Sequence, residues 1–198
     1  MSQILVLVGA ITAAIFYVFL IVEGVLRTGY DPVYHTGSEL SLGERGWVQI
    51  ANFLQFGVGM ICFAVGIGQL LDSLLGAALL VVFGLALIVA GVFLTDPVRG
   101  YPPGSPSGAP EKVSWHHQVH EAMGPLAFLA IFGACMNLAG RLDGLWQVYT
   151  VVTGVVGLGL TAWTALSFQR DASITGLVQR CLILVYVAWI VLLSIHLL

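Results

Sequence analysis

The segment LLGAALLVVFGLALIVAGVFL, residues 74–94, carries no charged side chain over its whole length. A helix rises about 1.5 Å per residue, so a run of this length covers the hydrocarbon core of a bilayer, which is roughly 30 Å thick. Because lipid offers no hydrogen-bond partner, the backbone of such a run must satisfy its own polar groups, as a helix does. Residues 74–94 therefore predict a transmembrane helix.

Five more apolar runs of similar length lie around it, at residues 4–26, 47–71, 118–139, 147–168 and 176–198. Each run is continuous and lacks the alternation of apolar and polar residues that marks a membrane β-barrel. The chain of 198 residues is 59% hydrophobic and 9% charged, whereas soluble domains carry roughly 25% charged residues. We therefore predict an all-α fold, a polytopic membrane bundle of six transmembrane helices that forms one domain over residues 1–198. The net charge of −3, without a basic patch, argues against binding of nucleic acid.

Two long polar connections distinguish one membrane face from the other. An even number of spans places both termini on the same side, so loop one (27–46), loop three (95–117) and the short connection 169–175 share the opposite side. We name this side the loaded face, because six of the seven Lys and Arg residues lie at or near it. The positive-inside rule places the loaded face in the cytoplasm. A polar functional site would produce the same asymmetry in either orientation.

Loop three contains the sequence YPPGSPSGAP, residues 101–110. This composition excludes a helix and favours extended, turn-rich backbone. The segment is either a plain surface linker or a flap that folds over a cavity on the loaded face.

The sequence SWHHQVHE, residues 114–121, concentrates three imidazoles and a carboxylate at the start of the fourth span. Residues three or four apart on a helix share a face, so His117, His120 and Glu121 line one side. These groups suit a divalent metal such as zinc, or a proton relay. Asp96 is a third candidate ligand beside His117 and His120, although the HExxH spacing of zinc enzymes is absent. The plain alternative is a set of hydrogen-bonded histidines at the membrane interface.

Acidic and imidazole groups from three segments are predicted to meet at the loaded face. Loop one supplies His35, Ser38 and Glu39, the third span ends at Asp96, and the fourth span supplies its histidines. Convergence from separate segments is the usual form of a site assembled by a fold. The candidate catalytic residues are Glu39, Asp96, His117, His120 and Glu121.

Polar side chains within apolar spans are costly and need an explanation. Gln49, Asn52 and Gln55 recur at a spacing of three in the second span. They either hydrogen-bond between helices or line a wet cavity. The candidate substrate-binding residues are Arg180, Asn52, Ser38 and His35.

Charged residues also occur in the first and sixth spans. Glu23 and Arg27 are four residues apart, so they predict an ion pair within one helix. Arg180 needs an acidic partner, a path by which its side chain reaches water, or the anionic head group of a lipid.

The polar residues occur in an order that resembles a known family. The pattern consists of Ser38-Glu39-Leu40, Gly46-Trp47 with Asn52-Phe53, Asp96-Pro97 with residues 100–104, His117 with His120, and Gln179-Arg180. It resembles the bacterial and archaeal membrane family called domain of unknown function 998, over nearly the whole chain. That family is more distantly similar to the six-span Frag1, DRAM and Sfk1 group, which is linked to lipid and membrane homeostasis in eukaryotes. The resemblance implies six helices and a prokaryotic cell membrane, and it brings no established activity.

Three functions fit these observations. The first is a membrane-embedded enzyme or lipid-handling protein with a lipid-like substrate, in which a divalent metal activates water or the histidines act as general acid and base. The second is a transporter of a small solute or lipid along the polar stripe of the second span. The third is a structural or regulatory subunit of a membrane complex that docks through the loaded face.

Overall fold

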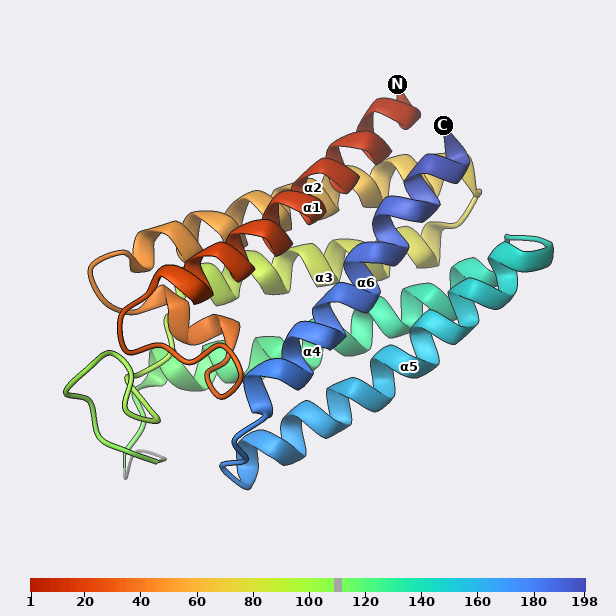
Figure 1. The fold of residues 1–198 in the computed structure, drawn as a ribbon. Coiled ribbons are helices and arrows are strands. Elements are labelled where there is room, and N and C mark those ends of the chain that lie inside the picture. The colour runs from red at the N-terminus through yellow and green to blue at the C-terminus, as the bar shows by residue number, and fades with distance from the viewer. Residues whose placement is uncertain (109–111) are drawn as a thin grey trace.

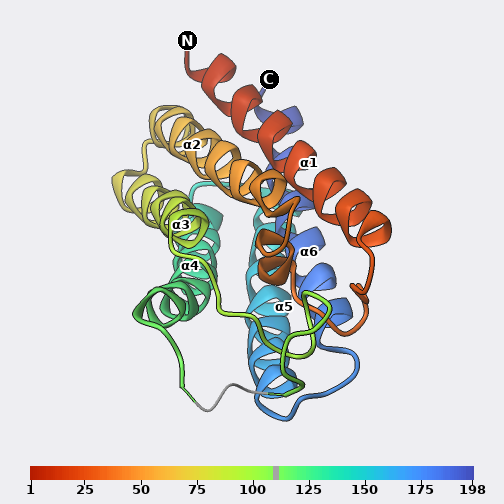
Figure 2. The same cartoon turned by 90° about the vertical axis from the view of Figure 1, so that its left-hand side faces the viewer.

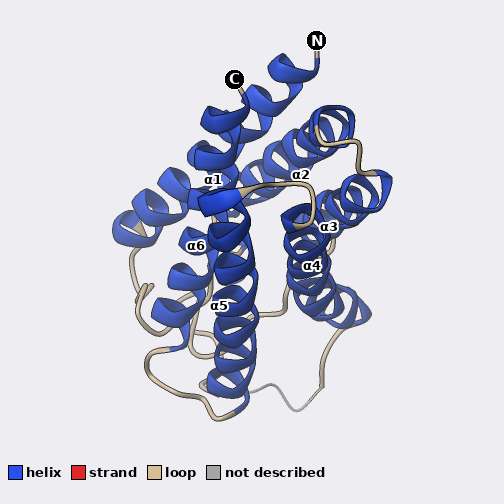
Figure 3. Cartoon of the chain, turned by 90° about the vertical axis from the view of Figure 1, so that its right-hand side faces the viewer, coloured by secondary structure: helices blue, strands red, loops and turns tan. Residues whose placement is uncertain are grey.

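The computed structural model describes residues 1–108 and 112–198. Within these residues it contains six long α-helices, one short 3-10 helix and no β-strand (Figure 3). They are α1 (Ser2–Leu26), η1 (Gly37–Ser41), α2 (Gly46–Leu70), α3 (Leu74–Val92), α4 (Trp115–Ala139), α5 (Gly144–Gln169) and α6 (Thr175–Leu197). Each of the six α-helices is long and apolar enough to cross a membrane. The predicted six-helix membrane bundle is confirmed, and every helix end lies within three residues of its predicted position.

The six helices form a ring. Each helix packs mainly against its neighbours in sequence, and α6 closes the ring by packing against α1. Figure 2 shows the helices following one another around the bundle from α1 to α6. In such a ring the centre is filled by side chains alone, so this topology can hold an internal cavity.

Both chain termini lie at one end of the bundle (Figure 1). The side chain of Gln3 donates hydrogen bonds to the carbonyls of Leu197 (3.3 Å) and Leu198 (3.0 Å), which ties the two ends together. Loop one, loop three and the connection between α5 and α6 lie at the opposite end, which is the loaded face.

The helices α1, α2 and α3 approach closely because glycines line their contacts. A Cβ added at Gly57 of α2 would lie 2.6 Å from the carbonyl oxygen of Gly84 on α3, and one at Gly59 would overlap Thr12 of α1. Membrane helices pack through such small residues, because lipid supplies no hydrophobic force between them. By contrast, α5 is buried over only 22% of its span, the least of the six. The ring is therefore tightest around α2 and loosest around α5.

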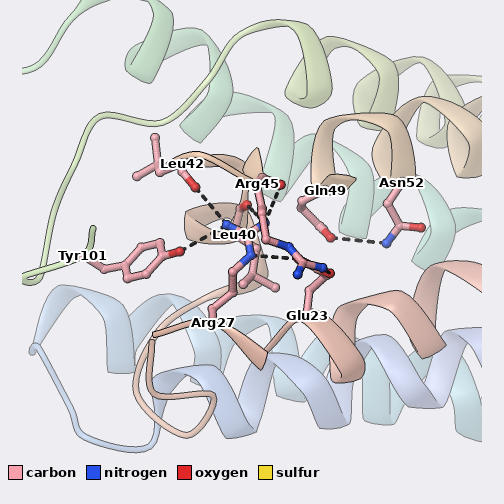
Figure 4. Close-up of polar contacts among 8 residues, drawn as sticks. All are labelled: Glu23, Arg27, Leu40, Leu42, Arg45, Gln49, Asn52 and Tyr101. Carbon is pink, nitrogen blue, oxygen red and sulfur yellow. Dashed lines mark hydrogen bonds and ion pairs between the residues drawn. The ribbon is translucent and has the colours of Figure 1, made fainter. Parts of the chain in front are cut away.

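Loop one folds back over the loaded end of the ring and is held there by the buried guanidinium of Arg27 (Figure 4). Its Nε donates to Glu23 at 2.8 Å, which confirms the predicted ion pair within α1. Its two Nη groups donate to the Tyr101 hydroxyl and to three loop-one carbonyls, those of Leu40, Leu42 and Arg45. A guanidinium has five N–H donors, and these hydrogen bonds use all of them.

A second buried guanidinium, that of Arg180 on α6, holds the middle of loop one. It donates to the carbonyls of His35 and Gly176, both at 3.0 Å, and to the Tyr30 hydroxyl at 2.6 Å. Of the alternatives predicted for Arg180, an acidic partner is not found among the described residues: its two Nη groups donate to carbonyl and hydroxyl oxygens, and its buried Nε has no hydrogen-bond partner there.

Loop three packs on loop one. The ring of Tyr101 lies edge-on to that of Tyr30, with 5.2 Å between centroids. Pro103 lies so close to Gly29 that a Cβ there would meet its ring at 2.6 Å, and Gly29 also has a positive φ of 76°. Of the two alternatives for residues 101–110, the flap over a cavity is not found in the described part: up to residue 108 the segment forms a second layer over loop one and does not line the cavity described below. Ala109 and Pro110 lie outside the described residues.

We predict that Arg27→Met lowers the free energy of unfolding by on the order of 3 kcal/mol, because three carbonyls lose their donor and buried Glu23 loses a partner. Thermal unfolding in detergent micelles measures the change. Arg141→Met is the matched control, since Arg141 is exposed at the opposite end of the bundle. Equal melting temperatures for the two variants would contradict the role assigned to Arg27.

Candidate functional site

A cavity of about 450 Å³ lies at the centre of the ring. All six helices and loop one line this space, which we name the central cavity. The wall is mostly apolar and includes six phenylalanines: Phe16, Phe53, Phe56, Phe83, Phe128 and Phe168. Ligand sites in proteins have volumes of roughly 300–1,000 Å³ and apolar walls with a few polar groups. The central cavity is therefore the candidate functional site.

The polar groups of the central cavity gather near the loaded face. They come from η1, its N-cap residue, the first two turns of α2, α4 and α6, and the last residue of α5: Thr36, Ser38, Gln49, His120, Glu121, Gln179 and Gln169. The deeper wall is apolar apart from a few hydroxyl groups. This gradient suits a molecule with a polar head and an apolar tail.

The central cavity opens between α4 and α5. Four of its wall residues are exposed, and all four belong to these two helices: Glu121, Pro125, Ala165 and Gln169. Pro125 and Ala165 lie inside membrane spans. The opening therefore faces the bilayer as well as the loaded face, and it lies beside α5, the least buried of the six helices.

His120 is the histidine that the structure brings to the central cavity. Its Nδ1 lies 2.9 Å from the carbonyl oxygen of Ala90 and 2.8 Å from that of Phe93, at the end of α3. Two acceptors at one nitrogen require Nδ1 to carry a proton, so the neutral ring keeps its lone pair on Nε2. The ring also packs edge-on against Phe53, with 6.3 Å between centroids. His120 thus offers a hydrogen-bond acceptor at the cavity wall.

Gln49 offers a donor at the same end. In the polar stripe of α2, the amino groups of Gln55 and Asn52 donate to the carbonyls of Thr12 (3.2 Å) and Phe16 (3.0 Å) on α1. These carbonyls fix the orientation of both amides, so Asn52 also donates to Oε1 of Gln49 at 3.3 Å (Figure 4). The Gln49 amino group then has no protein partner among the described residues, although the side chain is fully buried and lines the cavity.

Gln179 and Tyr186 line the cavity but were not among the site residues predicted from the sequence. Gln179 accepts a hydrogen bond from the Gly37 amide at 2.7 Å and so holds η1 over the cavity. A polar side chain near the start of an apolar span could have identified Gln179 from the sequence. Tyr186 lies in the middle of α6, where its buried hydroxyl has no partner within the described residues. No pattern in that apolar run indicates that Tyr186 faces the centre of the ring.

Asp96 and His117 lie outside the central cavity and join the end of α3 to the start of α4. The Asp96 carboxylate accepts from the amide and the hydroxyl of Ser114, at 2.6 and 2.7 Å. The Asp96 amide donates to Nδ1 of His117 at 3.0 Å. Within residues 1–108 and 112–198, no group of three His, Cys, Asp or Glu side chains could hold a metal ion. The predicted metal site of Asp96, His117 and His120 does not assemble.

The loop-one candidates His35 and Glu39 are buried and stabilise the loop itself. Glu39 accepts from the amide and the hydroxyl of Thr36, which forms a capping box around η1. Nδ1 of His35 accepts from the Asp31 amide at 2.8 Å, and its Nε2 donates to the Arg99 carbonyl at 3.1 Å. Neither side chain lines the central cavity.

The structure thus divides the predicted site residues into two groups. Ser38, His120 and Glu121 line the central cavity. Asn52 donates to the Phe16 carbonyl in the middle of α1. The others contact loops or helix ends instead: His35, Glu39, Asp96, His117 and Arg180.

One protein family, described as protein of unknown function (DUF998), has a family model that matches residues 10–196. This is the family that the order of motifs resembles, and the match does not extend to the Frag1, DRAM and Sfk1 group. No curated protein and no solved structure matches the chain.

We predict that stability falls as pH rises from about 5 to about 8, because of Glu39. Burial raises the pKa of Glu39 from 4.5 to about 7, although the hydrogen bonds from Thr36 oppose the shift. Between these values the folded protein keeps a proton that the unfolded chain loses, so raising the pH favours unfolding by up to about 3 kcal/mol.

Melting temperatures across this pH range measure the effect. Glu39→Gln removes the ionisable group and keeps the acceptor for Thr36, so the Glu39 component of the pH dependence disappears. Glu44→Gln, at an exposed position of the same loop, keeps it. An identical pH profile for Glu39→Gln and wild type would contradict the assignment.

Proposed function

This chain belongs to the DUF998 family and is an integral membrane protein, and we propose that it is a lipid-handling protein that holds a single-chain amphiphile in the central cavity. The observation that carries the proposal is an apolar cavity of about 450 Å³ with a polar end and an opening toward the bilayer. The amphiphile lies with its head near the loaded face and its chain among the phenylalanines.

The nature of the wall favours a hydrocarbon chain over water. Water occupies about 30 Å³ per molecule in the liquid, so this space would hold on the order of ten molecules. Each water needs polar partners, and cavities with apolar walls stay dry. A hydrocarbon chain needs no partners and gains from contact with aromatic rings.

The polar groups without partners support a bound ligand as well. A buried donor left unpaired costs on the order of 1–3 kcal/mol. Gln49 and Tyr186 both leave such a group at the cavity wall. A ligand that reaches these atoms offsets the cost.

The opening between α4 and α5 supplies an entry path. An amphiphile dissolved in the bilayer can move its chain sideways past Pro125 and Ala165 while its head stays near the loaded face. The excess of Lys and Arg at that face favours a cytoplasmic orientation in a prokaryotic cell membrane.

The residues that suggested transport or catalysis make other contacts in the structure. The polar stripe that suggested transport is hydrogen-bonded to α1 through Asn52 and Gln55. The carboxylates of Glu39 and Asp96, which suggested catalysis, accept hydrogen bonds from Thr36 and Ser114. We therefore propose binding, without hydrolysis and without a metal.

Photolabelling tests the proposal. Protein in lipid nanodiscs is exposed to hexadecanol and to hexadecyl sulfate, each with a photoreactive diazirine in the chain. We predict labelling of cavity residues such as Phe53 and Phe128 that saturates and is displaced by excess unlabelled amphiphile. Labelling that increases without saturation for both probes would be contact with bulk lipid and would contradict the proposal.

A pair of glycine variants localises the site. A Cβ added at Gly124 or at Gly159 meets no atom within 4 Å. Gly124 lines the central cavity, whereas Gly159 is exposed on α5 and does not. We predict that Gly124→Phe reduces saturable labelling several-fold because the ring fills the cavity, and that Gly159→Phe leaves it unchanged. Equal labelling of the two variants would place the probe elsewhere.

A further inference from the structure

We infer that the amphiphile in the central cavity has an uncharged head that both donates and accepts hydrogen bonds, such as a long-chain alcohol or primary amide. This inference rests on the proposed function and names its ligand class. It excludes fatty carboxylates and alkyl phosphates or sulfates as preferred ligands.

The charges around the cavity disfavour an anion. None of the described residues that line it is Lys or Arg, and Glu121 is an acid at its opening. The buried guanidinium of Arg180 on α6 does not line the cavity, and both of its Nη groups donate to Tyr30, His35 and Gly176. An anionic head would enter a desolvated site without a cation to pair with, which is strongly unfavourable.

The hydrogen-bonding groups at the polar end form a matched pair. Gln49 lies one helical turn before Phe53 on the same face of α2, and the ring of Phe53 contacts that of His120. Gln49 and His120 thus both line the cavity beside Phe53, one with an amide donor and the other with an imidazole acceptor. The donor is fixed by the chain of amides anchored on α1, and the acceptor by the two carbonyls at the end of α3.

A hydroxyl or a primary amide satisfies both groups at once. Its oxygen accepts from the Gln49 amino group, and its O–H or N–H donates to Nε2 of neutral His120. An ionised carboxylate or sulfate can only accept, so it leaves the His120 lone pair facing negative charge.

Competition against the photoreactive probes tests this inference. The competitors are hexadecanol, hexadecanamide and hexadecyl sulfate, which share one chain and differ in the head, and each is titrated over the same range of mole fractions in phosphatidylcholine nanodiscs. We predict that the alcohol and the amide displace the probe at concentrations at least about tenfold lower than the sulfate. Equal or stronger displacement by hexadecyl sulfate would overturn the inference.

Two substitutions assign the preference to named residues. Glu121→Gln removes the charge at the opening and should improve binding of the sulfate, relative to binding of the alcohol, several-fold. Glu44→Gln, which is exposed at the same face but does not line the cavity, should change neither. Gln49→Met removes the donor and should weaken binding of the alcohol about fivefold to tenfold. An unchanged ratio of alcohol to sulfate binding in both Glu121→Gln and Gln49→Met would also overturn the inference.

The proposed lipid binding and the preference for an uncharged head group are contradicted by different results. If neither photoreactive probe labels the cavity saturably, the proposed function fails and the inference fails with it. If both probes label saturably and the sulfate competes best, only the choice of head group is wrong.

Discussion

The buried guanidinium of Arg27 is the interaction on which the loaded face depends. A charge at the end of a membrane helix must find an acceptor for each donor, and Arg27 finds them in Glu23, Tyr101 and three loop-one carbonyls. Loop one must therefore fold back over the ring, which places η1 above the central cavity. Arg180 holds the same loop from α6. The cavity is thus closed at its polar end by loop one, and its opening is left to the side, between α4 and α5.

The ring of helices explains why a cavity exists at all. Glycine contacts draw α1, α2 and α3 together, while α5 packs mainly on α4 and α6 and remains the least buried helix. Large aromatic side chains point into the centre without filling it. The ring also determines which polar groups have partners: the amides of Asn52 and Gln55 and the imidazole of His120 donate hydrogen bonds to carbonyls of the neighbouring helices. Gln49 and His120 each keep one hydrogen-bonding atom for the cavity. The carboxylates of Glu39 and Asp96 are instead hydrogen-bonded to Thr36 and Ser114 outside the cavity, which leaves Glu121 as the one carboxylate among the described wall residues.

Much of the fold was accessible from the sequence, but only part of the site was. Apolar runs of bilayer length predicted all six helices, and the spacing of Glu23 and Arg27 predicted their ion pair. Of the histidine segment, only His120 and Glu121 line the cavity. His117 lies outside it, where its Nδ1 contacts the backbone amide of Asp96 and the hydroxyl of Thr95, and a backbone partner leaves no trace in the sequence. Tyr186 was missed because the run around it in α6 is apolar on all sides, so the sequence does not indicate which face of the helix points to the centre of the ring. Loop one covers the cavity, and the described part of loop three does not, because Arg27 and Arg180 donate hydrogen bonds to carbonyls of loop one.

The central claim is that the ring encloses one amphiphile. Native mass spectrometry of the protein released from nanodiscs tests this most directly, because weakly held boundary lipids dissociate before an enclosed molecule does. The account predicts one long-chain molecule retained per chain in wild type and in Gly159→Phe, and its loss from Gly124→Phe. A wild-type protein that sheds every lipid as readily as Gly124→Phe would contradict it.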